Sequence, residues 1–176
     1  MAEEENKFIY VIHPWKRDPL TPEIFLDLET ALARYELVST KAELVPRMSF
    51  QELRDCQYRR MTLSLNKENS LMLHFWECSF ELREKLYPGQ NVYIVQQSFG
   101  RIADIPEVFI SKEDAIKKFY NLRAMLVPEE NYPELEIDPR KKLENKEQMG
   151  YAGDVFGVFT EVWMWSVDIR FSNTKK

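Results

Sequence analysis

The sequence predicts an α+β fold made of two tandem, pseudo-symmetric copies of a small β-β-α-α-β-β module, packed into one globular unit. The first observation is a strand, loop and helix pattern that recurs at Phe8–Val38 and Asn91–Leu122. The second is that later elements of the two copies keep a constant spacing, and the third is a last strand in which apolar and polar residues alternate. We therefore expect a first module at residues 1–88 and a second module at residues 89–176.

Each copy opens with two strand-like segments separated by a polar loop. β-Branched and aromatic residues dominate Ile9–Ile12 and Val92–Val95, as is typical of strands. A Pro-Glu-Ile/Val-Phe segment follows at Pro22–Phe25 and again at Pro106–Phe109, and it predicts a second, short strand.

A helix follows the short strand in each copy. Asp27 and Ser111 are residues favoured at a helix N-cap, because their side-chain oxygens accept hydrogen bonds from free backbone N–H groups. After each cap, apolar residues recur at helical spacing and form one stripe. The stripe of the first copy is Leu28, Ala31, Leu32 and Tyr35, and that of the second is Ala115, Ile116, Phe119 and Leu122.

A second helix is predicted in each copy. Ser49–Glu52 forms a capping box and opens a helix that we expect to reach about Arg60. In the second copy, Asp138-Pro139 places a capping residue before a proline at the first helical position, and Gly150 is expected to end that helix. The two capping residues are 89 positions apart.

Two strands close each copy, Met61–Asn66 with Leu71–Phe80 and Val155–Phe159 with Glu161–Phe171. In the last strand, large apolar residues alternate with polar ones, so that one face holds Trp163, Trp165, Val167, Ile169 and Phe171. Trp76 and Trp165 are again 89 positions apart. The repeated offset supports an internal duplication of nearly the whole chain.

Composition and charge narrow the class of protein. Hydrophobic residues make up 44% and aromatic residues 13% of the 176 residues, enough for a packed core. With 24 basic and 29 acidic residues, the formal net charge is −5, which argues against a nucleic-acid partner. Only Cys56 and Cys78 occur, no apolar run reaches the ~20 residues of a membrane span, and the acidic start is unlike a signal peptide. We expect a soluble cytoplasmic protein in a reducing environment, away from membranes.

No segment matches a catalytic, nucleotide-binding or metal-binding motif. Phosphate loops, nucleophile elbows, HExxH and CxxC are all absent from the sequence. His74, Trp76 and Cys78 alternate on one predicted strand face, but a third ligand or catalytic partner at a recognisable spacing is missing. We interpret them as a hydrogen-bonded histidine and a buried thiol. The sequence therefore predicts a protein without enzymatic activity, cofactor or metal.

Binding residues are instead predicted in the loops that follow the first strand of each copy. An exposed aromatic residue beside cations can anchor a partner protein. The loops His13–Pro19 and Gln96–Ala103 each hold an aromatic residue with a nearby cation. The candidate binding residues are Trp15, Lys16, Arg17, Phe99 and Arg101. The alternative is that Trp15 packs into the core while its cationic neighbours face water.

These features predict a non-enzymatic interaction protein that binds another protein through its loops or a sheet edge. The longer Pro- and Glu-rich excursion at Val127–Pro139 is a further candidate surface. The alternative is a binder of small molecules or nucleotides, an enzyme included, that uses a cleft between the modules. Oligomeric state stays open between monomer and homodimer.

Overall fold

The computed structural model describes residues 7–15, 20–56, 61–68, 70–100, 102–128, 149–155 and 157–172. These residues divide into two compact units. The first contains the described residues up to Gln90 together with those from Asp168 onward, and the second spans Asn91–Val167. Each unit combines at least one α-helix with antiparallel strand pairs, which confirms the predicted α+β class.

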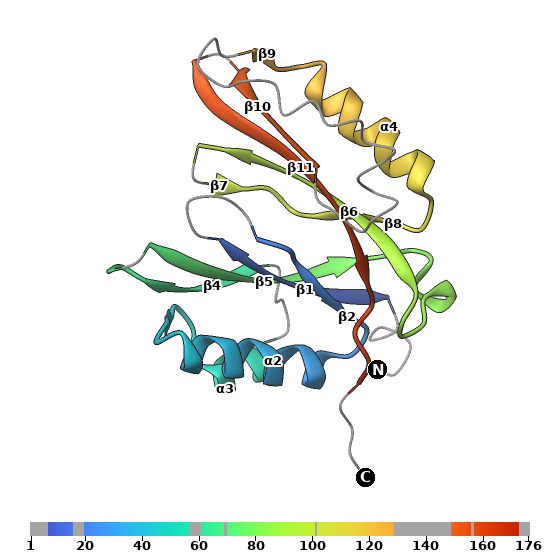
Figure 1. Cartoon of the computed structure of the whole chain (residues 1–176). Helices are drawn as coiled ribbons and strands as arrows, with labels where there is room; N and C mark the ends of the chain where they lie inside the picture. Colours follow the sequence, from blue (N-terminus) through green and yellow to red (C-terminus); the bar gives the residue numbers. More distant parts are fainter. Residues whose placement is uncertain are drawn as a thin grey trace. The chain divides into compact units, whose positions relative to one another are not determined.

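The first unit contains a five-stranded sheet in the order β2-β1-β5-β4-β3 (Figure 1). Its elements are β1 (Phe8–Trp15), β2 (Glu23–Phe25), α2 (Leu28–Lys41), β3 (Val45–Pro46), α3 (Phe50–Asp55), β4 (Met61–Asn66) and β5 (Leu71–Ser79). A short 3-10 helix, η1 (Arg83–Lys85), follows. The long central pair runs from Phe8 opposite Ser79 to Trp15 opposite Met72, and both edge strands are short.

Local signals set the helix starts of the first unit. The Asp27 carboxylate accepts a hydrogen bond from the Thr30 N–H at 2.7 Å. Ser49 and Glu52 form the predicted capping box, with reciprocal hydrogen bonds of 3.2 and 2.9 Å. α3 ends at Asp55, earlier than the expected end near Arg60, which itself lies outside the described residues.

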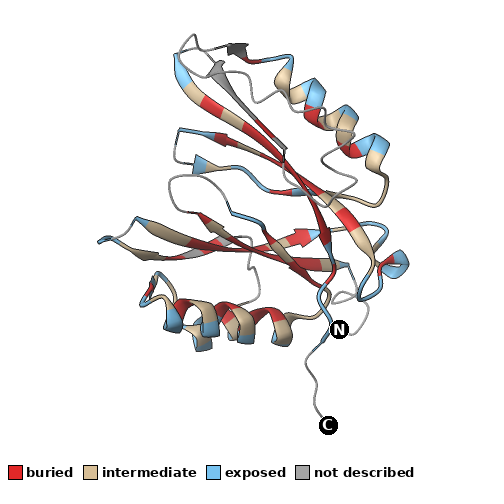
Figure 2. Ribbon diagram, viewed as in Figure 1, coloured by how far each residue is buried: buried red, intermediate tan, exposed pale blue. Residues whose placement is uncertain are grey.

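The core of the first unit lies between α2 and one face of the sheet. The predicted apolar stripe of α2 faces inward, and Figure 2 shows α2 buried on the side toward the strands and exposed on the other. The buried residues of this core are Tyr10, Ile12, Phe25, Ala31, Leu32, Tyr35, Leu44, Leu53, Leu73 and Phe75. Alternate residues of β1 and β5 supply the strand side, as the period of two requires.

A chain of hydroxyl groups joins α2 to β4 inside this core. The Ser64 hydroxyl donates to the Tyr35 hydroxyl at 2.8 Å, and the Ser39 hydroxyl donates to Ser64 at 3.2 Å. Burial raises the pKa of Tyr35 to about 12, although the hydrogen bond from Ser64 lowers it in part. The network satisfies polar atoms that would otherwise be costly to bury.

The second unit contains a sheet in which β6 pairs with both β7 and β8 on one side, followed by β11, β10 and β9. Its elements are β6 (Asn91–Phe99), β7 (Ile102–Ala103), β8 (Glu107–Phe109), α4 (Lys112–Arg123), β9 (Val127–Pro128), β10 (Met149–Val155) and β11 (Val158–Asp168). Ser111 caps α4 as predicted, by accepting from the Asp114 N–H at 3.3 Å. The core against α4 is formed by Val95, Ala115, Phe119, Leu126, Val162 and Met164.

Gly150 does not end a helix but lies in β10, directly opposite Trp163 of β11. Most of the helix predicted from Asp138 onward lies outside the described residues. The closing hairpin also differs from the prediction, since β10 ends at Val155, where we expected a strand to begin. β11 ends at Asp168, so the predicted strand is too long, and Phe171 is 69% exposed. Burial does not alternate along β11, because Val162–Val167 are all buried, and the rings of Trp163 and Trp165 are stacked with their centroids 6.2 Å apart.

Candidate functional site

Trp15 is the last residue of β1, and its side chain is only 7% exposed. Its ring centroid lies 5.2 Å from that of His13 and 6.1 Å from that of His74. This placement matches the alternative in which Trp15 packs inward, so its ring offers little surface to a partner. Lys16 and Arg17 lie outside the described residues, as does Arg101.

Phe99, in contrast, presents its side chain at the end of β6, where it is 39% exposed. It stands opposite Ile102 of β7, which is 74% exposed. The Gly100 N–H donates to the Phe159 carbonyl at 2.6 Å and ties this turn to the start of β11, where Val158 is also exposed. We name Phe99, Ile102 and Val158 the hairpin patch, an exposed apolar surface of the kind that often contacts other proteins.

The alternating residues His74, Trp76 and Cys78 are buried on the sheet face opposite to α2. Burial lowers the pKa of His74 to about 4 and, with nearby Glu77, raises the pKa of the Cys78 thiol to about 12. Four residues of an extended strand span about 13 Å, so the His74 imidazole is too far from the Cys78 thiol to act as its base. His74 Nδ1 and Trp76 Nε1 have no hydrogen-bond partner among the described residues, although His74 does form a hydrogen bond with the His13 backbone.

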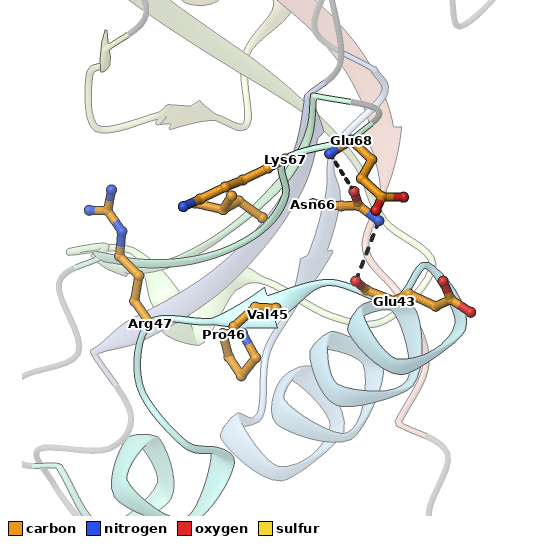
Figure 3. Close-up of a pocket in the computed structure, with 8 residues that line it drawn as sticks. Glu43, Val45, Pro46, Arg47, Asn66, Lys67 and Glu68 are labelled. Atoms are coloured by element: carbon orange, nitrogen blue, oxygen red, sulfur yellow. Dashed lines mark hydrogen bonds between the residues drawn. The ribbon is translucent and has the colours of Figure 1, made fainter.

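A hollow of about 620 Å³ lies at the β3 edge of the first sheet, and we name it the edge pocket (Figure 3). The turn after α2, strand β3 and the turn between β4 and β5 surround it. Its lining residues are Glu43, Val45, Pro46, Arg47, Leu65, Asn66, Lys67 and Glu68.

Two tight turns shape the walls of the edge pocket. Glu43 adopts a left-handed φ of 53°, which reverses the chain after α2 and leads it into β3. On the facing wall, the Asn66 side chain accepts from the Glu68 N–H at 2.9 Å, as in an Asx-turn. The Asn66 amide also donates to the Glu43 carbonyl at 3.5 Å, so one side chain links both walls.

The floor of the edge pocket is apolar and its sides have opposite charges. Val45 is 70% exposed and pairs across the ladder with Leu65, so both side chains lie on one face of the sheet. Figure 3 shows Arg47 and Lys67 pointing to one side of the pocket, with the carboxylates of Glu43 and Glu68 on the other. This arrangement can receive an apolar group flanked by charges, but its lining residues contain no nucleophile beside a base.

The sequence predicted the strand pair Met61–Asn66 and Leu71–Phe80, whose connecting turn forms one wall of the edge pocket, but it did not predict the pocket. The edge pocket forms only when the Asn66 side chain contacts the Glu43 carbonyl, and these two residues are 23 positions apart in the chain. The pairing of β3 with β4 brings them together. A pairing between a two-residue strand and a distant hairpin leaves no periodic pattern in the sequence.

Neither a metal-binding cluster nor a membrane-spanning helix occurs in the part of the chain that the structure describes. There, no three His, Cys, Asp or Glu side chains gather closely enough to hold a metal ion. None of the described helices is long and apolar enough to cross a membrane. Comparisons of the chain with protein-family models, curated proteins and solved structures found no match.

Proposed function

We propose that this chain is a non-enzymatic cytoplasmic protein that binds another protein, with the edge pocket as its main contact surface. The observation that supports this most is Val45, an aliphatic side chain 70% exposed on the floor of a hollow of about 620 Å³. An apolar side chain of a partner placed there would remove this surface from water. Cys56 and Cys78 are not joined in a disulfide, which suits the reducing cytoplasm.

The charges around the edge pocket define the kind of partner segment that fits it. An apolar anchor residue would occupy the floor, with a basic residue toward Glu43 and Glu68 and an acidic residue toward Arg47 and Lys67. β3 has only two residues, and Pro46 lacks a backbone N–H, so a partner gains few main-chain hydrogen bonds here. Recognition by side chains is therefore favoured over addition of a strand.

We also propose that the two units are diverged copies of one module. The strand order of the first sheet, β2-β1-β5-β4-β3, resembles β8-β6-β11-β10-β9 in the second, which also contains β7, a strand without a counterpart in the first sheet. Each unit places a capped helix after the three-residue strand that pairs with its first strand, β2 or β8, and before the short strand at the far edge. Duplication would allow the two copies to diverge in their exposed loops while their cores stay similar.

Replacing Val45 by aspartate is expected to weaken binding of a matching peptide at least tenfold without unfolding the protein. The new carboxylate puts a charge on the apolar floor, and an exposed site tolerates substitution within about 0.5 kcal/mol. Peptides would be selected from a displayed random library on the wild-type protein, and their affinities measured by fluorescence anisotropy. Leu37→Asp, at an exposed position of α2, is the matched control and should leave affinity unchanged. Equal binding by the Val45 variant would contradict the proposal.

A Phe99→Asp/Ile102→Asp double variant is expected to weaken binding of the whole partner protein about tenfold but not binding of the selected peptide. The hairpin patch belongs to the other unit and would form a separate contact. The measurement compares both affinities for the same preparations, after circular dichroism has shown that the fold is retained. If whole-partner affinity does not change, the hairpin patch is not part of the interface, even if the edge pocket is.

A further inference from the structure

We propose that the first unit also contains a binding site for a small aliphatic carboxylate, in a cavity beside α2 that is separate from the edge pocket. The cavity measures about 230 Å³. Ile12, Val38 and Leu73 form its apolar interior, and Glu23, Arg34 and Arg170 form its charged rim. We name it the arginine cavity.

The apolar interior follows from the register of the sheet. Ile12 of β1 stands opposite Glu23 of β2, and Leu73 of β5 stands opposite Pro14 of β1. These alternate positions share the face of the sheet that packs against α2, which adds Val38 from its last turns. Ile12 and Leu73 are fully buried, so the base of the cavity is apolar.

At the rim of the arginine cavity, the guanidinium groups of Arg34 and Arg170 both form ion pairs with the single carboxylate of Glu23. Arg34 makes a bidentate pair with Glu23, with Nε–Oε2 at 2.7 Å and Nη2–Oε1 at 3.1 Å. Arg170 approaches the same carboxylate, with Nη2–Oε1 at 2.8 Å. One negative charge offsets only one of the two positive charges, so the rim keeps a net charge of +1 that a monoanion would neutralise.

The geometry of the rim leaves donors for such an anion. Each guanidinium has five N–H groups, and these ion pairs use two on Arg34 and one on Arg170. Arg170 is held in place because its backbone N–H donates to the Ile24 carbonyl at 2.9 Å. Glu23 holds both planar groups at the mouth of the cavity, and prior orientation lowers the entropy that binding costs.

The charge, the hydrogen-bond donors and the volume of the arginine cavity indicate which class of ligand it binds. A guanidinium group matches a carboxylate in shape and can bind it by two parallel hydrogen bonds. The single net positive charge favours a monoanion over a dianion such as phosphate. The cavity volume lies just below the roughly 300–1,000 Å³ usual for drug-sized ligands. A short aliphatic acid, with its carboxylate on Arg34 and Arg170 and its chain against Ile12 and Val38, fits both parts.

The proposal is tested by methyl NMR on the full chain, titrated with acetate, butanoate, hexanoate and inorganic phosphate. We expect the methyl signals of Ile12, Val38 and Leu73 to shift with butanoate, while those of Val162 in the second unit do not. Affinity should rise about fourfold for each methylene added until the cavity is full. No shift at the three cavity residues, equal affinity along the series, or phosphate binding as tight as butanoate would each overturn the proposal.

Variants of the rim separate the arginine cavity from general attraction to surface cations. Arg170→Gln and Arg34→Gln should each weaken butanoate binding about tenfold, since each removes a charge-assisted hydrogen bond. Arg54→Gln is the matched control, because Arg54 also forms an ion pair with a glutamate, Glu29, at 3.3 Å, and does not line the cavity. Unchanged affinity in both rim variants, or an equal loss in Arg54→Gln, would contradict the site.

Discussion

Lowering the pH from 7 to 4 is expected to remove about 3 kcal/mol of folding free energy through His74 alone. His74 is only 5% exposed, and its pKa falls from an ordinary 6.5 to about 4 in the folded protein. Burial is the main cause, and the charge of Arg47 lowers the pKa further, while a hydrogen bond with the His13 backbone acts in the opposite direction. The folded state thus holds a neutral imidazole that the unfolded chain readily protonates.

The pH range of this loss follows from the two pKa values of His74. Above pH 6.5 the imidazole is neutral in both states, and its contribution to stability is fully present. As the pH falls from 6.5 to about 4, the unfolded chain binds a proton that the folded protein does not, so unfolding becomes easier. Below pH 4 both states are protonated, and the loss through this residue reaches its limit.

Urea unfolding followed by circular dichroism at pH 7, 5.5 and 4 measures this effect. His74→Leu is the informative variant, because it keeps the volume approximately and removes a buried Nδ1 that has no partner among the described residues. We expect it to be close to wild type at pH 7 and about 3 kcal/mol more stable than wild type at pH 4. Both proteins retain His13 and every carboxylate, so the difference isolates His74. Parallel stability curves for the two proteins would refute this prediction.

Replacing Gly150 by alanine is expected to destabilise the second unit by about 2 kcal/mol, through overpacking. A Cβ atom at this position would lie 2.4 Å from two carbon atoms of the Trp163 ring. Trp163 cannot move away freely, because its ring is buried and stacked on Trp165 at an angle of 16°. The clash outweighs the stabilisation of roughly 0.5–1 kcal/mol that alanine usually gives over glycine inside a strand.

A double-mutant cycle with Trp163→Leu identifies the cause of this loss. In the Trp163→Leu background the ring is gone, so Gly150→Ala should be neutral or slightly stabilising. Thermal unfolding by calorimetry gives the four free energies that the cycle needs. The same loss in both backgrounds would show that the ring contact is not the cause.

The secondary structure at Gly150 could not be predicted from the sequence alone. A glycine after a polar, helix-compatible stretch is typical of a helix C′ position, and the same residue is typical of a strand that a large side chain crosses closely. The contact that decides between them is with Trp163, thirteen positions later and on another strand. Trp15 is a second example, because the residues next to it in the sequence do not determine whether its ring packs into the core or faces solvent.

Local interactions were predictable from the sequence alone. The caps at Asp27, Ser49 and Ser111 depend on hydrogen bonds that span three residues, so the sequence contains all of their partners. The α+β class and the inward stripe of α2 follow from periodicity for the same reason. Phe99 was selected from the sequence as a candidate binding residue, and its exposure became known only from the structure.

The candidate sites were decided only by the tertiary structure. The edge pocket exists because β3 pairs with β4, and the arginine cavity exists because a residue near the end of the chain, Arg170, reaches a carboxylate on β2. The sequence by itself determined where α2, α3 and α4 begin, because a helix start depends on neighbours within a few residues. Which side chains meet across the sheet depends on long-range strand pairing, and its register is set by the packing of the whole core.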